Sequence, residues 1–162
     1  MRLNYKAAFP AGYRVMVELG RVAGQSTLEP ALLELVKLRA SQLNGCAYCL
    51  DMHSKDARAL GETQQRLDLL AAWREAPVYS VRERAALGWC ESITLLADTG
   101  SPDQAYDELS ACFTPEEQVA LTIAIVAING WNRLAVGFRS PVGDYVSPHH
   151  SAPAPAAPPR EL

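Results

Sequence analysis

The apolar run from Val119 to Ile128 limits the fold more than any other stretch of the chain. It reads VALTIAIVAI and follows a strong helix start signal. Thr114 suits an N-cap, Pro115 suits the first turn, and Glu117 suits the partner position of a capping box. A helix that is apolar almost all round is buried in a core or against a partner subunit. The run is also far shorter than the roughly 20 residues that a transmembrane helix needs. We therefore expect the chain to fold around a buried helix.

Helical signals recur along the rest of the chain, and no stretch shows the sustained alternation of apolar and polar residues that is typical of strands. Ser26 with Glu29, and Ser80 with Glu83, are spaced as capping boxes at helix starts. We predict an all-α fold of six or seven helices, with residues 1–9 as an irregular lead-in. The expected helices cover residues 10–24, 26–43, 46–60, 63–73, 80–98 and 102–112, and a last one runs from 114 through at least 128.

A change in composition divides the chain of 162 residues into two parts. Ser140 and Pro141 interrupt the helical pattern, and the final segment is rich in proline and alanine. Residues 1–140 are long enough to bury a hydrophobic core. We expect them to form one domain and residues 141–162 to form an extended or disordered tail.

The charge balance excludes several classes of partner. The chain carries 15 Lys and Arg against 18 Asp and Glu, which gives a net charge of −3. We therefore expect no nucleic-acid partner and no binding to an anionic membrane. The N-terminal residues lack the apolar core of a signal peptide, so we expect a cytoplasmic protein. In that reducing compartment its four cysteines should rest as thiols.

Four residues in the stretch ELVKLRASQLNGCAYCLDMH carry the chemistry. Cys46 and Cys49 form a CxxC pair, His53 follows four residues after the second cysteine, and Glu34 precedes the first by twelve. Asn44-Gly45 ends one predicted helix, so the pair should lie in the first turn of the next. Unpaired N–H groups and the helix dipole lower a thiol pKa there. A dithiol beside a base indicates redox or metal chemistry.

The alternatives to a redox site carry less weight. A thioredoxin-like site needs strands around the CxxC, and none is predicted. Cys46, Cys49 and His53 could supply three zinc ligands, but no second Cys or His pair follows at the spacing of a zinc finger or ribbon. Cysteines are also often plain core residues, and we favour that interpretation for Cys90 and Cys112.

The joint spacing of Glu34, Cys46, Cys49 and His53 resembles the AhpD-like alkylhydroperoxidases of the carboxymuconolactone decarboxylase superfamily. The words ELVKLRASQLNGCAYCLDMHSKDAR and INGWNRLAVGFR are similar to the same family, and the resemblance covers roughly residues 10–139. It implies an all-helical fold that assembles as homotrimers or homohexamers. Tyr48 stands where well-studied peroxidases of the family can carry a histidine.

The resemblance also implies a role for each residue of the motif. Cys49 would be the peroxidatic cysteine and Cys46 the resolving cysteine, while His53 and Glu34 would form the proton relay. It implies no cofactor, an organic hydroperoxide as substrate, and an external dithiol or protein as reductant. Decarboxylases of the superfamily lack the cysteine pair, so lactone decarboxylation is the less favoured chemistry.

We therefore expect a thiol-dependent peroxidase that reduces alkyl hydroperoxides. Two other functions stay open at this point. One is an oligomeric redox sensor or disulfide module on the same scaffold, and the other is a zinc-binding module built from the two cysteines and His53.

Overall fold

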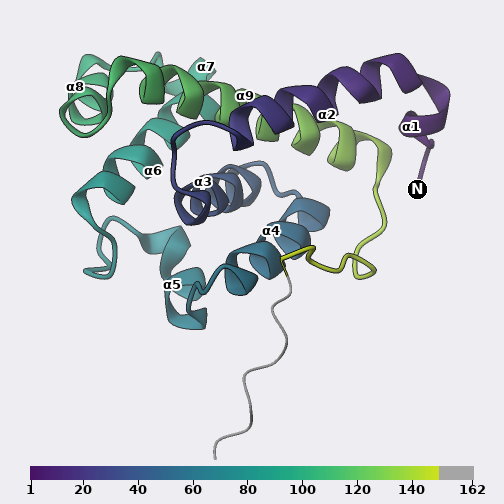
Figure 1. Cartoon of the computed structure of the whole chain (residues 1–162), viewed down its shortest axis with the longest axis horizontal. Coiled ribbons are helices and arrows are strands. Elements are labelled where there is room, and N and C mark those ends of the chain that lie inside the picture. The colour runs from purple at the N-terminus through teal and green to yellow at the C-terminus, as the bar shows by residue number, and fades with distance from the viewer. Residues whose placement is uncertain (150–162) are drawn as a thin grey trace, which may run out of the picture.

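The computed structural model describes residues 1–149, and within them the chain forms nine α-helices, one 3₁₀-helix and no strand (Figure 1). The predicted all-α class is confirmed. Seven of the α-helices have six or more residues, and α1 and α7 are single four-residue turns. The elements are α1 (Tyr5–Ala8), α2 (Pro10–Gly24), α3 (Pro30–Leu43), α4 (Ala47–Ala59), α5 (Gln64–Leu69), η1 (Leu70–Ala72), α6 (Val81–Thr94), α7 (Leu96–Thr99), α8 (Asp103–Cys112) and α9 (Pro115–Phe138).

Two predicted helix starts are confirmed in detail. The hydroxyl of Ser80 accepts from the Glu83 N–H at 3.2 Å, and the Glu83 carboxylate accepts from the Ser80 N–H at 2.7 Å. Thr114 and Glu117 form the same reciprocal pair at the start of α9. These capping boxes satisfy backbone donors that the first turn of a helix leaves free.

Other predicted boundaries were wrong. The lead-in contains the α1 turn, capped by Asn4, whose side chain accepts from the Ala7 N–H. The second long helix begins at Pro30 and not at Ser26, so the proposed box with Glu29 does not form. The hydroxyl of Ser26 instead donates to the Ala23 carbonyl at the end of α2. The predicted helices 63–73 and 80–98 each divide in two.

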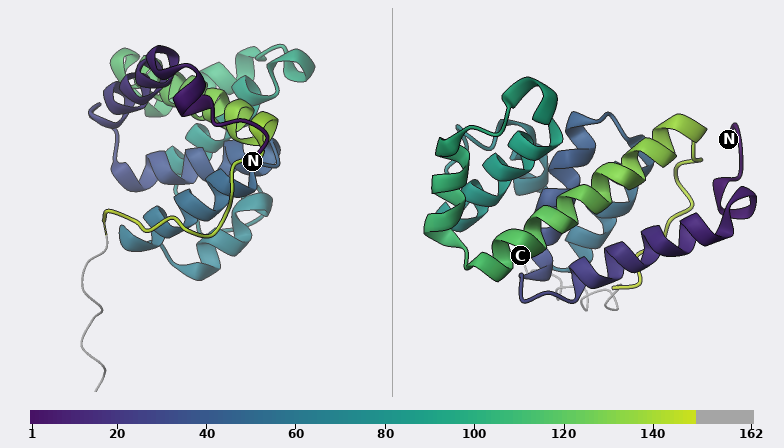
Figure 2. Two further views of the ribbon diagram at one scale, coloured as in Figure 1. Left: turned by 90° about the vertical axis from the view of Figure 1, so that its right-hand side faces the viewer. Right: turned by 90° about the horizontal axis from the view of Figure 1, so that it is seen from above.

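Helix α3 lies at the centre of the molecule. It packs against α4, α6 and α9. Helix α2 packs along α9 (Figure 2). Eight of its fourteen residues are buried, and they lie on most of its circumference: Leu32, Leu33, Glu34, Leu35, Val36, Leu38, Ala40 and Ser41. A helix enclosed on this many sides can hold a charged side chain away from water, and α3 holds Glu34 in this way.

Helix α9 is the long apolar helix that the sequence predicts. Its buried face contacts α2, α3 and α6, while Val119, Val126 and Val136 remain exposed. By length and composition it is the one helix within residues 1–149 that could cross a bilayer, a test that core helices of soluble proteins also pass. Because α4 and α8 also pack against it, α9 contacts five other helices and is a core helix of the domain.

The segment that follows α9 returns to the body of the protein. In Figure 1 it runs from the end of α9 down to α4. The Lys55 ammonium on α4 donates to the carbonyls of Gly143 at 3.3 Å and Tyr145 at 2.9 Å, and Ser147 is buried. The first residues of the predicted tail therefore contact the domain. The rest of that predicted tail, residues 150–162, lies outside the described residues.

Candidate functional site

The start of α4 places the cysteine pair inside the protein. Gly45 adopts a left-handed backbone with φ of 62°, which favours glycine, and so turns the chain from α3 into α4. Cys46 is the N-cap of α4, and its sulfur accepts a hydrogen bond from the Cys49 N–H at 3.4 Å. Both cysteines are 1% exposed and belong to the larger core cluster. The predicted position of the CxxC at a helix N-terminus is confirmed.

The two thiols differ in pKa. A hydrogen bond from the Cys49 side chain lowers the pKa of Cys46 to about 6, helped by the Cys49 backbone N–H and opposed by burial. The same side-chain bond raises the pKa of Cys49, and burial and the charge of Cys46 add to this effect. Within the pair, Cys46 is therefore the thiol that loses its proton more readily.

Glu34 on α3 and His53 on α4, one turn after Cys49, lie in the geometry of a buried ion pair. The Nδ1 atom of His53 lies 2.7 Å from Oε2 of Glu34, and both residues are 7% exposed. Burial by itself would raise the pKa of Glu34, but hydrogen bonding and charge from His53 and Lys37 outweigh it and lower the pKa to about 2. Glu34 is then an acceptor only, so Nδ1 of His53 must carry a proton. In neutral His53 this leaves Nε2 as the basic nitrogen.

Lys37 completes the pairing of Glu34. Its ammonium lies 2.7 Å from Oε1, the carboxylate oxygen that His53 does not use. It stands three residues after Glu34 on α3, where side chains share a face. Sequence analysis did not select Lys37, although this spacing was a usable signal.

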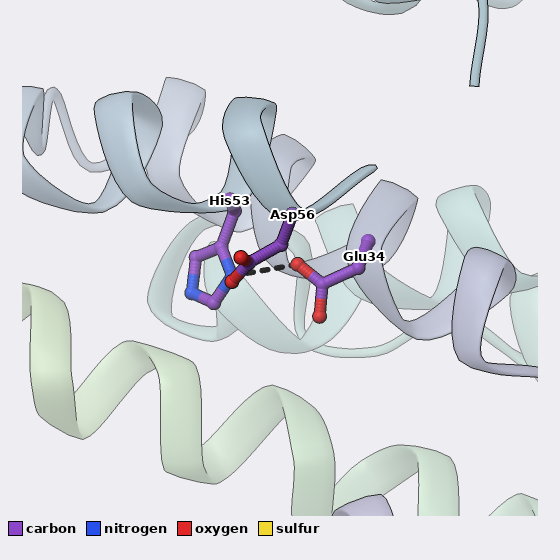
Figure 3. Close-up of side chains that lie close together, drawn as sticks. All are labelled: Glu34, His53 and Asp56. Carbon is purple, nitrogen blue, oxygen red and sulfur yellow. Dashed lines mark hydrogen bonds and ion pairs between the residues drawn. The ribbon is translucent and has the colours of Figure 1, made fainter. Parts of the chain in front are cut away.

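Asp56 is a third buried group at the same place (Figure 3). Glu34, His53 and Asp56 each offer one side-chain atom that could bind a metal ion, and these three atoms lie within 4.8 Å of one another. The Tyr145 hydroxyl donates to both Asp56 oxygens, at 2.9 and 3.0 Å. Asp56 follows His53 by three residues on α4, a helical spacing that sequence analysis did not use. Tyr145 comes from beyond α9, and no local pattern could have placed it here.

Asn132 of α9 also belongs to the site. Its side chain is 1% exposed, donates to the Ser41 hydroxyl at 3.1 Å and accepts from the Asn44 amide at 2.9 Å. Its polar side chain also lowers the pKa of both cysteines, by a smaller amount than the effect of each cysteine on the other. Asn132 lies within the word INGWNRLAVGFR, but its place beside the cysteines was not predicted from the sequence.

A cavity of 310 Å³ opens beside these residues. Cys49 and His53 lie on its wall, one helical turn apart on α4, whereas Cys46 does not line it. Tyr5, Tyr13, Tyr48 and Trp131 supply aromatic side chains, and several alanines complete an apolar lining. The cavity places a space for a small organic molecule beside Cys49.

The four predicted site residues therefore lie in two adjoining groups. Glu34 contacts His53 directly, Cys46 contacts Cys49 directly, and the cavity brings Cys49 and His53 to one wall. Within residues 1–149 the one close group of three or more possible metal ligands is Glu34, His53 and Asp56, and it includes neither cysteine. The carboxylates of that group are already satisfied by Lys37, His53 and Tyr145.

Comparisons with known sequences agree on one family. The model of the carboxymuconolactone decarboxylase family matches residues 10–92. The chain is 41% identical to the uncharacterized protein YdfG of Bacillus subtilis over 135 residues, which cover 83% of this chain and 92% of YdfG. It is 29% identical to the uncharacterized protein YnjA of Escherichia coli over 72% of this chain and 61% of YnjA.

Solved structures share the fold. A protein of unknown function from Agrobacterium tumefaciens, provisionally assigned to antioxidant defence as AhpD, is 47% identical with a TM-score of 0.86 over 89% of this chain and 99% of that chain. The debrominase Bmp8 is 17% identical with a TM-score of 0.76, over 85% of this chain and 74% of its own. An AhpD-core protein of Ralstonia eutropha is 20% identical with a TM-score of 0.74, over 86% and 74%. The family match and the close relatives show that this chain belongs to the carboxymuconolactone decarboxylase family, on its AhpD-like side.

Proposed function

We propose that the protein is a thiol-dependent peroxidase that reduces organic hydroperoxides through a dithiol and disulfide cycle. The observation that supports this most is the cavity, which has an apolar lining and holds Cys49 and His53 on one wall. Such a lining suits the organic group of a hydroperoxide and excludes water from the reacting atoms. The Glu34–His53 pair supplies a positioned base beside the thiol.

In the first step Cys49 loses its proton and attacks the O–O bond of the hydroperoxide. The proton passes to Nε2 of His53, or to the Cys46 sulfur when that sulfur is ionised, a state that the lowered pKa of Cys46 favours. The Cys49 sulfur bonds to the terminal oxygen, the O–O bond breaks, and the alkoxide takes up one proton. The products are an alcohol and a sulfenic acid on Cys49. Glu34 acts as a positioning residue, because it holds the His53 ring and its protonated Nδ1.

In the second step the Cys46 sulfur attacks the sulfenic acid, releases water and forms the Cys46–Cys49 disulfide. Only two residues separate the cysteines, and their sulfur and backbone atoms already make contact. An external dithiol or protein reductant must then reduce the disulfide by exchange. This cycle requires a reducing compartment such as the cytoplasm. We also propose, from the family resemblance, that the protein works as a homotrimer or homohexamer.

The choice of Cys49 as nucleophile depends on access. Cys46 has the lower pKa, but Cys49 is the sulfur that lines the cavity. A thiolate on Cys46 does not line the cavity and so could not reach the substrate there. Because the two cysteines are in contact, Cys49 can pass its proton to Cys46 and become the thiolate that attacks. We therefore assign attack to Cys49 and resolution to Cys46.

A redox-sensing or disulfide module is the second candidate. The raised pKa of Cys49 and the 1% exposure of both sulfurs favour slow reaction with peroxide. The debrominase Bmp8 has the same fold, so the scaffold serves more than one reaction. In this case the pair would oxidise reversibly without efficient turnover.

The experiment compares the wild type with Cys46→Ser and Cys49→Ser, using cumene hydroperoxide and dithiothreitol. We expect multiple turnover in the wild type and a loss of at least about a thousandfold in both variants. Cys46→Ser should still consume one equivalent of peroxide and yield a dimedone adduct on Cys49 by mass spectrometry. Cys90→Ser is the matched control, and its rate should stay within twofold.

Three outcomes would contradict parts of this proposal. A dimedone adduct on Cys46 alone, found in Cys49→Ser, would reverse the two cysteine roles. An unchanged rate in Cys49→Ser would exclude the peroxidase mechanism. A wild type that forms the disulfide reversibly but turns over slowly would favour the redox module.

A further inference from the structure

The wall of the cavity carries positive charge and no carboxylate. Among the described residues that line it, Lys6 and Lys37 are the two lysines, and none is Asp or Glu. Lys37 is paired with Glu34, which lies behind the wall. Lys6 has no hydrogen-bond or carboxylate partner among residues 1–149, and its ammonium lies 5.2 Å from the centre of the Tyr13 ring. The cavity therefore presents one cation that is free to bind a ligand.

Lys6 and Cys49 line the same cavity. Lys6 belongs to the α1 turn and is exposed, whereas Cys49 is buried on α4. Tyr48 and the other aromatic side chains line the cavity with them. A ligand held at both Cys49 and Lys6 would therefore contact this aromatic wall.

The size and lining of the cavity restrict the organic part of such a ligand. A volume of 310 Å³ lies at the lower end of the range of about 300 to 1,000 Å³ for small-molecule sites, so it suits a small organic ligand. The rings of Tyr13 and Trp131 meet edge to face at 5.6 Å, and both residues line this space. An aromatic ring or a short branched chain suits this space better than a long fatty acyl chain.

We propose that the natural substrate is a small organic hydroperoxide with an apolar body that carries a carboxylate. The hydroperoxide group lies at Cys49 and His53, the apolar body lies among the aromatic side chains, and the carboxylate pairs with Lys6. The hydroperoxide part of this assignment rests on the proposed function. The anionic and apolar parts rest on the charge and size of the cavity alone.

A binding experiment without peroxide tests the ligand class. The probes are 4-isopropylbenzoate and its uncharged isostere 4-isopropylbenzamide, and the measurement is isothermal titration calorimetry at pH 7.5. We expect the benzoate to bind about three- to fivefold more tightly, the range of a solvent-exposed ion pair. Lys6→Met should remove this preference. Arg14→Met removes an exposed charge that does not line the cavity, and it should keep the preference.

Equal binding of the two probes, tighter binding of the amide, or binding of neither would overturn the proposal. So would a benzoate preference that survives in Lys6→Met. The preference should also shrink in 0.5 M NaCl, because salt screens exposed charges. Since Lys6 is exposed and its contact with the Tyr13 ring is the one interaction of its ammonium among residues 1–149, we expect its replacement to leave the fold intact, which circular dichroism checks.

Turnover then separates this inference from the proposed function. Cumene hydroperoxide and its 4-carboxy derivative have the same reacting group, and we expect the carboxylated form to have a three- to fivefold higher kcat/KM in the wild type only. Turnover without charge preference would overturn the ligand class and support the peroxidase. Charge preference in binding with no turnover of either compound would support the ligand class and overturn the peroxidase.

Discussion

Two buried glutamates, Glu34 on α3 and Glu91 on α6, have nearly equal exposure but opposite surroundings. Glu91 is 9% exposed, and Arg39 and Trp73 each donate to it at 2.7 Å, while Arg74 makes a further ion pair. Its partners include two arginines, which stay protonated at all ordinary pH values. Glu34 is 7% exposed and pairs with Lys37 and His53. Of these two centres, only that of Glu34 includes a histidine.

The position of each centre adds to the difference in chemistry. Glu34 pairs with Lys37 and His53, and both of these partners line the same cavity as Cys49. Glu91 lies on α6, and its partners come from α3 and from the turn after η1, so the cluster links these three segments. None of its partners lines that cavity. A buried carboxylate held by permanent cations fixes the packing of helices. A buried carboxylate that orients a titratable ring beside a thiol can move a proton. Burial alone therefore does not distinguish a structural charge from a functional one.

The sharpest test of this comparison replaces each glutamate with glutamine. Glu34→Gln should lower kcat/KM for cumene hydroperoxide several hundredfold, equivalent to about 3.5 kcal/mol, because His53 loses its orienting carboxylate. Glu91→Gln is the matched control, and its rate per folded molecule should stay within twofold. Equal losses in the two variants would show that the two centres do not differ in function.

The next largest effect concerns stability. Glu91→Gln leaves Arg39 buried without its countercharge, with a side chain that is 14% exposed. We expect the free energy of unfolding in urea to fall by about 3 kcal/mol, a typical cost of breaking a buried pair. Arg74 adds little, since its side chain is 61% exposed. A change below about 1 kcal/mol would mean that Glu91 does not hold the helices together.

The pH dependence of stability provides a third test. The pKa of Glu34 is lowered from 4.5 to about 2 in the folded protein. Its ionised form therefore stabilises the fold fully above about pH 4.5, and this contribution is lost as the pH falls toward 2. We expect about 3 kcal/mol from this group. Urea unfolding at pH 5, 4 and 3 should show a steeper decline in the wild type than in Glu34→Gln. Parallel declines would contradict the lowered pKa.

The smallest expected effect belongs to Tyr145, whose hydroxyl binds Asp56, the second carboxylate of the cluster of Glu34, His53 and Asp56. Tyr145→Phe removes both hydrogen bonds to Asp56. We expect a loss of about 1 kcal/mol in unfolding free energy, since the single hydroxyl of a half-buried tyrosine is removed. Peroxidase turnover should change by less than threefold. A larger loss of turnover would extend the functional centre to the segment after α9.

Local patterns were enough to predict most of the helices and the core of the site. The capping boxes at Ser80 and Thr114 and the CxxC at a helix start were confirmed, because each depends on residues within one turn. The box at Ser26 failed for an equally local reason. Pro30 favours extended backbone at Glu29 and suits the first position of α3, so the helix begins there. Ser26 then binds the end of α2.

Contacts distant in sequence were not predictable in this way. Asn132 reaches Ser41 across 91 positions, and Tyr145 reaches Asp56 across 89. Nothing in the short-range spacing of these residues indicates the contact, since it depends on how α9 crosses α3 and on where the following segment returns. The roles assigned to Cys46, Cys49, His53 and Glu34 remain predictions. The cavity that supports them was visible only in three dimensions.

The cap at Cys46 has a consequence for the local dynamics of α4. In the reduced protein its sulfur is the acceptor for the Cys49 amide, and the lowered pKa of Cys46 favours a negative charge, which suits a helix start. In a disulfide that sulfur is neutral and a weaker acceptor. Loss of a cap costs about 1 kcal/mol, or roughly fivefold in the opening equilibrium of the first turn. Amide hydrogen exchange at Cys49 would therefore report the oxidation state of the pair, with the first turn of α4 opening more often each time the pair is oxidised.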